Sequence, residues 1–296
     1  MPGVPGLFIE EQKAGWKKIA DAIHAQGGYA YLQLWYAKRK RKNNFSGTEL
    51  TNVRHSGRAN IPQMTGTPIV SPSGLPWDNP DECFAYPPPH TSKQARYIDN
   101  PPIELTVEHI KKTIQDYVRT AKWAMECGFD GVEVHGGNGY LPEQFLASNV
   151  NKRTDAYGGS PEKRCTFTLE LMEELSKAIG DENLAIRLSP FGLFNQIRCE
   201  QRMETWTTLC RKLKEAHPTL SYVSFIEPVS SFVSRRWPTT DRIYSATNRS
   251  TAKPKSRSSS TLGASARSTS HPSATSSAAY RSSPPVASIT QTHGAY

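Results

Sequence analysis

The chain has 296 residues, enough for one barrel-sized domain or for two small ones. Its formal net charge of +9 is concentrated in two places, Lys38–Lys42 and the region after Asp241, which contains no acidic residue, so the rest of the chain is mildly acidic. This distribution argues against a basic nucleic-acid surface on the folded part, and no stretch reaches the roughly 20 apolar residues that span a bilayer.

Between Glu10 and Ile243 amphipathic helical stretches alternate with short apolar runs, which predicts a parallel α/β fold. Ser160 followed by Pro161 is a strong helix start, and Thr106 is a plausible N-cap for an earlier helix. The pattern gives four helix–strand units. Their predicted helices are 10–26, 106–127, 160–179 and 200–216, followed by strands 29–35, 131–135, 184–189 and 222–228.

Two segments depart from this alternation. Residues 38–102 are rich in proline and polar side chains without clear periodicity, and we expect them to form an excursion over the mouth of the fold. Residues 235–296 are rich in serine, alanine and arginine with almost no aliphatic run, so we expect a disordered tail. The predicted domain therefore covers residues 1–234.

The candidate site lies where the strand 131–135 ends. His135 and Asn138 could together donate hydrogen bonds to a substrate oxygen that gains negative charge. Tyr140 adds a weak acid suited to protonating a basic enolate carbon. Each of these residues taken alone could have a structural role, such as satisfying backbone carbonyls or packing, so the functional interpretation depends on their occurring together.

The segment from His135 to Leu146, HGGNGYLPEQFL, and the following NKRTDAYGGS at 151–160 resemble the signature of the old yellow enzyme family. The resemblance covers roughly residues 5–228 and implies a TIM (β/α)8-type barrel, of which this chain holds about strands 3 to 6 and lacks both ends. In that family FMN takes hydride from NADPH or NADH and returns it to Cβ of an α,β-unsaturated carbonyl.

The resemblance also implies roles for single residues. His135 and Asn138 would bind the substrate carbonyl and Tyr140 would protonate Cα. Gln33 would contact the flavin pyrimidine, Arg187 would lie near flavin N1 and O2, and the stretch with Phe194 and Asn195 would line the substrate pocket. The residues 151–160 are expected to be mainly structural, and no metal ligands are expected.

An alternative function remains open: a catalytically inactive remnant that binds FMN poorly or not at all, because the family's flavin-phosphate segments have no counterpart in this sequence. A third hypothesis, a nucleic-acid or nuclear-targeting surface formed by Lys38–Lys42 and the basic tail, is weak because the tail lacks interleaved aromatic residues.

The cellular setting is inferred from cysteines and from the N-terminus. Five cysteines without CxxC spacing favour a reducing compartment, and the first residues resemble no signal peptide, so we expect a cytoplasmic protein without membrane contact. Its partners would be a small enone and, through exposed barrel edges, a second copy of the chain.

Overall fold

The computed structural model describes residues 6–7, 9–35, 57–66, 68–89, 91–227 and 287–288. The basic block Lys38–Lys42 and the tail from residue 235, apart from Ala287–Ser288, lie outside these residues. The chain divides into two compact units, and the first, residues 1–228 with 286–296, contains every described residue.

The centre of this unit is a five-stranded sheet in the order β6–β5–β4–β1–β7. Each neighbouring pair of strands is parallel. The strands are β1 (Ala30–Leu34), β4 (Gly131–Gly136), β5 (Leu184–Leu188), β6 (Tyr222–Phe225) and β7 (Ala287–Ser288). The first four match the predicted strands, so the α/β fold expected from the sequence is confirmed.

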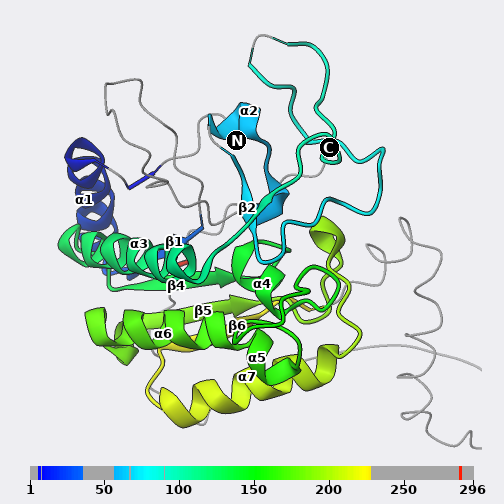
Figure 1. Cartoon of the computed structure of the whole chain (residues 1–296). Coiled ribbons are helices and arrows are strands. Elements are labelled where there is room, and N and C mark those ends of the chain that lie inside the picture. The colour runs from blue at the N-terminus through cyan, green and yellow to red at the C-terminus, as the bar shows by residue number, and fades with distance from the viewer. Residues whose placement is uncertain are drawn as a thin grey trace, which may run out of the picture. The chain divides into compact units, whose positions relative to one another are not determined.

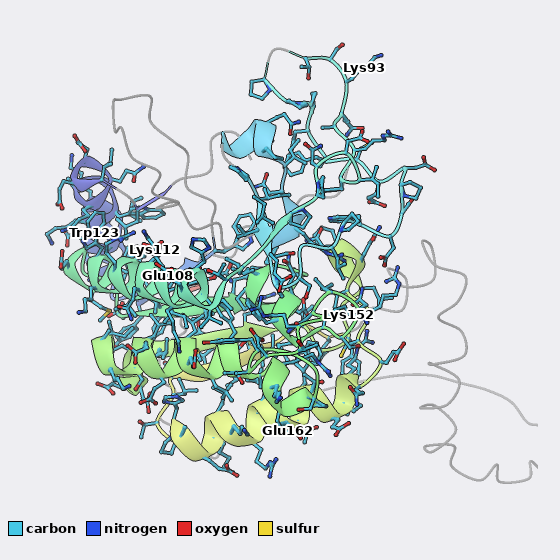
Figure 2. All side chains as sticks on the ribbon, viewed as in Figure 1. Lys93, Glu108, Lys112, Trp123, Lys152 and Glu162 are labelled. Atoms are coloured by element: carbon cyan, nitrogen blue, oxygen red, sulfur yellow. The ribbon has the colours of Figure 1, made fainter. Side chains whose placement is uncertain are left out.

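Four long helices precede β1, β4, β5 and β6 in turn, as expected for helix–strand units. They are α1 (Glu10–His24), α3 (Val107–Glu126), α6 (Thr166–Ile179) and α7 (Arg202–Ala216). Figure 1 shows α3 and α6 side by side over one face of the sheet. The charged residues Glu108 and Lys112 of α3, labelled in Figure 2, lie outside the set of its buried side chains, which includes Ile110 and Ile114.

Local chemistry fixes several helix ends. The side chain of Thr106 accepts a hydrogen bond from the His109 amide and caps α3, and Ser160 likewise accepts from the Lys163 amide. The helix predicted over 160–179 is divided in two, α5 (Pro161–Arg164) and α6. At Cys165 the amide is shared between the carbonyls of Pro161 and Glu162, a tightened turn that interrupts the regular ladder.

The sheet has one apolar and one polar face. Val132, Val134, Ile186 and Leu188 are fully buried in the main core with the helices. Because side chains alternate along a strand, the intervening residues of the same strands point to the opposite face. That face carries the predicted site.

The described part of the excursion is more ordered than its sequence indicates. It contains a 3-10 turn (Gly57–Ala59), α2 (Pro62–Thr65) and strand β2 (Val70–Ser71), which pairs in parallel with β3 (Ile103–Glu104). Its apolar residues form a second small core, with the side chain of Tyr140 packed against it. The buried members of that core are Ala59, Ile61, Trp77, Phe84 and Tyr97.

Two kinds of feature are absent from the described residues. None of their helices has the length and apolar character needed to cross a membrane. The same residues contain no group of three or more His, Cys, Asp or Glu side chains placed to hold a metal ion.

Candidate active site

Strand register brings the predicted polar residues onto one face of the sheet. Gln33 of β1 is paired with Glu133 of β4, and His135 of β4 is paired with Arg187 of β5. Paired residues on parallel strands project to the same side, and His135 lies two residues beyond Glu133 on its own strand. Side chains more than 150 residues apart in sequence therefore share one surface.

Three rings meet at the end of this surface. The centroid of the Trp35 ring lies 6.2 Å from that of His135 and 5.1 Å from that of Tyr140. The His135 and Tyr140 rings are 5.3 Å apart. The strand-borne histidine and the loop-borne phenol, which sequence analysis paired as carbonyl ligand and acid, are thus neighbours in the structure.

His135 is held neutral by its surroundings. The residue is 6% exposed, and burial, reinforced by the nearby Arg187 guanidinium, lowers its pKa to about 4. Within the described residues its Nδ1 atom is buried without a hydrogen-bond partner. A neutral imidazole with an unpartnered nitrogen can hydrogen-bond to a ligand, whereas it is a poor source of a proton at neutral pH.

Tyr140 is a half-buried phenol at the N-terminus of α4 (Leu141–Leu146). Burial raises its pKa, and a side-chain hydrogen bond with Asn195 opposes that rise. The phenol is therefore protonated at neutral pH and can serve as a proton donor.

Asn138, which lies between these two residues in the sequence, has a left-handed backbone conformation with φ of 54°. Its amide donates to Ser189 Oγ at 2.7 Å, and its carbonyl accepts from Asn195 Nδ2 at 2.8 Å. Both main-chain groups are therefore bound, while the side chain remains half-exposed at the edge of the site.

Gln33 has a defined amide orientation. Its Nε2 donates to Glu133 Oε1 at 2.5 Å, so the NH2 group faces Glu133. The carbonyl oxygen of the same amide is then directed away from Glu133 and can accept a bond from a ligand N–H. Arg187, two strands along the sheet, adds a cation to this polar face.

Phe194 is the most exposed of the predicted site residues. It opens a 3-10 turn (Phe194–Gln196), and its side chain is 48% exposed. Its backbone contacts the site: a Cβ added to Gly139 would lie 2.6 Å from the Phe194 carbonyl oxygen. The predicted segment thus borders the loop 137–140, and its ring is accessible.

Sequence analysis missed three residues that hold these groups in place: Glu133, Glu143 and Ser189. Glu133 and Glu143 are 8% and 1% exposed. The signal available was the presence of acidic residues inside an apolar strand and at the start of an apolar helix, since buried carboxylates need hydrogen-bond donors. Their partners lie on other elements and could not be identified from sequence.

The segment 151–160 is structural in the described fold, in agreement with expectation. Arg153 is bound to Asp155 and donates to the carbonyls of Pro72 and Leu105. Asn151 donates to the carbonyls of Phe145 and Tyr157. These bonds join the loop after α4 to the excursion.

Comparison with known proteins gives one consistent result. A model of the NADH:flavin oxidoreductase / NADH oxidase family matches residues 1–284. The flavin oxidoreductase hxnT of Emericella nidulans is 39% identical over 233 residues, covering 77% of this chain and 52% of the relative. The 12-oxophytodienoate reductase 2 of Arabidopsis thaliana is 37% identical, with 64% and 44% covered. The chain spans about half the length of the curated relatives it matches.

Solved structures agree with the sequence comparisons. Morphinone reductase in complex with tetrahydroNAD matches with a TM-score of 0.62 and 30% identity, covering 81% of this chain and 58% of that one. The old yellow enzyme homologue from Zymomonas mobilis matches with a TM-score of 0.61 and 25% identity, covering 75% and 54%. The described strands thus form part of a TIM (β/α)8-type barrel. The chain belongs to the NADH:flavin oxidoreductase / NADH oxidase family, which includes old yellow enzyme.

Proposed function

We propose that the protein is an FMN-dependent ene-reductase that transfers hydride from NADPH or NADH to Cβ of an α,β-unsaturated carbonyl while Tyr140 protonates Cα. The observation that carries the proposal is the cluster of Trp35, His135 and Tyr140. In it a His135 ring nitrogen that has no hydrogen-bond partner among the described residues lies beside a protonated phenol. The names of its relatives, flavin oxidoreductase and oxophytodienoate reductase, describe chemistry of the same class.

His135 and Asn138 would bind the substrate carbonyl oxygen. Neutral His135 would donate one N–H bond, and the half-exposed Asn138 side chain would donate a second. Two donors directed at that oxygen stabilise the negative charge that develops when hydride reaches Cβ. Burial, reinforced by Arg187, keeps the histidine neutral, so the contribution of His135 would be hydrogen bonding and not proton transfer.

Tyr140 would deliver the proton that completes the reduction. Its phenol is protonated at neutral pH, and the resulting phenolate would recover a proton from water after each turnover. The neighbouring Trp35 and the second core beside Tyr140 shield the phenol from solvent.

The polar face of the sheet fits a flavin ring. Gln33 has its amide oxygen turned away from Glu133 to accept from a pyrimidine N–H, and Arg187 would stabilise negative charge on the same ring. When bound there, FMN would supply the hydride-transfer chemistry. Phe194 would line the pocket at the entrance. A cytoplasmic location is part of the same proposal, supported by the five cysteines, all free thiols.

A spectrum of the purified chain titrated with FMN tests the proposal. The expected result is saturable binding with a perturbed flavin absorbance, followed by flavin reduction with NADPH or NADH and reoxidation by an enone. Colourless protein that takes up no added FMN would support the inactive-remnant alternative.

Tyr140→Phe should separate the two half-reactions. Because the proton donor is removed and the aromatic ring is kept, enone reduction should slow by roughly 10²- to 10⁴-fold while flavin reduction changes little. Stopped-flow absorbance at the flavin band measures both steps. Tyr117→Phe, which alters a buried tyrosine of α3, is the matched control and should leave both rates unchanged. Equal slowing of both half-reactions in Tyr140→Phe would contradict the role as proton donor.

A further inference from the structure

The loop that carries Asn138 and Tyr140 has a backbone that needs external support. Asn138 and Gly139 are consecutive residues in the left-handed region, with φ of 54° and 71°. A non-glycine residue there costs roughly 1–2 kcal/mol relative to ordinary conformations. The loop therefore adopts this shape only if surrounding groups stabilise it.

Two buried side chains supply that support. Glu143 of α4 accepts from the Gly139 amide through Oε2, at 2.5 Å, and from the Ser189 hydroxyl through Oε1, at 2.8 Å. The same Ser189 oxygen accepts from the Asn138 amide at 2.7 Å. Both residues are 1% exposed. A continuous hydrogen-bonded relay thus joins α4, the end of β5 and two successive amides of the loop.

Close packing limits how the loop could shift. A Cβ added to Gly137 would lie 2.8 Å from Ser189 Oγ, and one added to Gly139 would lie 2.5 Å from Asn195 Cβ. The loop is therefore confined between Ser189 on one side and Asn195 on the other. His135, by contrast, is fixed by its strand and makes no bond to the relay that the structure records.

We propose that Glu143 and Ser189 are positioning residues for the carbonyl-binding and proton-donating loop, holding Asn138 and Tyr140 in register with the strand-borne His135. This inference rests on the proposed function. Each residue would act through its hydrogen bonds: Ser189 through the Asn138 amide, and Glu143 through Ser189 and the Gly139 amide. Loss of the relay should displace the loop-borne groups and leave the strand-borne ones in place.

The relay can exist with Glu143 charged or neutral. Burial raises the pKa of Glu143 to about 8, while the Gly139 and Ser189 donors and Arg202 of α7 oppose the rise. A neutral carboxyl could donate to Ser189 Oγ and still accept from Gly139, since a hydroxyl oxygen has two acceptor sites. Glu143→Gln copies this neutral form, with the amide NH2 facing Ser189. Glu143→Leu removes both bonds at similar volume.

The test compares Ser189→Ala, Glu143→Gln and Glu143→Leu in the full chain. Ser189→Ala and Glu143→Leu should lower kcat/KM for enone reduction by roughly 10- to 100-fold, as expected for a small misplacement of reacting groups. Their FMN dissociation constants should stay within about twofold of wild type, because Gln33 and Arg187 lie outside the relay. Glu143→Gln should restore most of the rate. Thr113→Val, equally buried in α3, is the control for loss of a buried hydroxyl.

A second readout does not depend on catalysis. The amide signals of Asn138 and Gly139, followed by NMR with hydrogen exchange, should lose protection in Ser189→Ala and Glu143→Leu and keep it in Glu143→Gln. If Glu143→Leu does not fold, Ser189→Ala, which removes a single oxygen, decides the outcome. Wild-type kinetics and protected amides in Ser189→Ala would overturn the proposal.

Failure of the proposed function and failure of the positioning role would give different results. If the wild-type chain binds no FMN or reduces no enone, the proposed function fails and the positioning role falls with it, while the amide signals still report whether the relay forms. If wild type is active and Glu143→Gln is as impaired as Glu143→Leu, charge and not positioning is the contribution of Glu143, and the proposal is wrong for that residue.

Discussion

The candidate site has a strand-borne side and a loop-borne side, and they are stabilised differently. Gln33, His135 and Arg187 are placed by the register of three parallel strands, which is set by apolar packing on the opposite face of the sheet. Asn138 and Tyr140 are placed by side-chain hydrogen bonds and contacts with residues about 50 positions away. Strand geometry supplies the fixed frame, and the loop depends on a few individual bonds.

This difference extends to pH, because each side has a buried group whose pKa is shifted. Glu143 supports the loop with a pKa raised to about 8, and His135 lies on the strand with a pKa lowered to about 4. Both groups favour the neutral form in the fold, so their effects on stability have opposite signs. Measuring stability against pH can therefore distinguish the two sides.

The largest expected effect on the pH dependence of folding stability is that of Glu143. Its carboxyl ionises near pH 4.5 in the unfolded chain and only near pH 8 in the fold, so the unfolded state binds fewer protons between these values. Stability contributed by this group should fall as pH rises from about 4.5 to 8, by several kcal/mol at most. Glu143→Gln, which cannot ionise, should remove that slope. Urea midpoints at pH 5 and pH 8 measure it, and a Glu143→Gln curve parallel to wild type would show that the carboxyl is already ionised in the fold.

The sequence predicts the strand-borne side of the site better than the loop-borne side. The helix–strand alternation located β1, β4, β5 and β6, and the strand end located His135, because local periodicity and strand direction depend on residues close together in sequence. The resemblance to old yellow enzyme added roles for Gln33 and Arg187, whose pairing partners the register then supplied.

What the sequence could not give are the contacts between distant elements. Nothing near Glu143 in the chain identifies Ser189 as its partner, and the polar excursion gave no sign of the stacked Trp77 and Tyr97 rings, 3.9 Å apart. The break at Cys165 was missed for another reason: the residue keeps helical dihedral angles, so only the hydrogen-bond ladder changes. Tertiary bonds of this kind depend on the whole fold and not on local pattern.

The second-largest effect on the pH dependence of stability is that of His135, and its direction is opposite to that of Glu143. The imidazole would ionise near pH 6.5 in the unfolded chain but near pH 4 in the fold, so the unfolded state binds more protons between these values. Stability from this group is fully present above pH 6.5 and is lost as pH falls toward 4, by about 3 kcal/mol. His135→Gln should lose less stability than wild type between pH 7 and pH 4.5, measured by urea unfolding. Identical losses in the two proteins would contradict the buried neutral histidine.

The smallest of the three effects tests the loop by its backbone alone, through two glycines with positive φ. Gly139 and Gly159 have φ of 71° and 90°. An added Cβ at Gly139 would lie 2.5 Å from Asn195 Cβ, whereas at Gly159 it would lie 3.9 Å from the Arg153 carbonyl oxygen, an ordinary contact. Gly159→Ala should therefore cost about 1 kcal/mol from backbone strain alone, whereas Gly139→Ala should cost about 2 kcal/mol or more because packing adds to strain. Thermal unfolding measures both. Gly139→Ala should also impair enone reduction while FMN binding is retained, because it moves the loop and leaves the strands in place. Equal costs for the two substitutions, or loss of FMN binding with intact enone chemistry, would show that the loop is not the separately held part of the site.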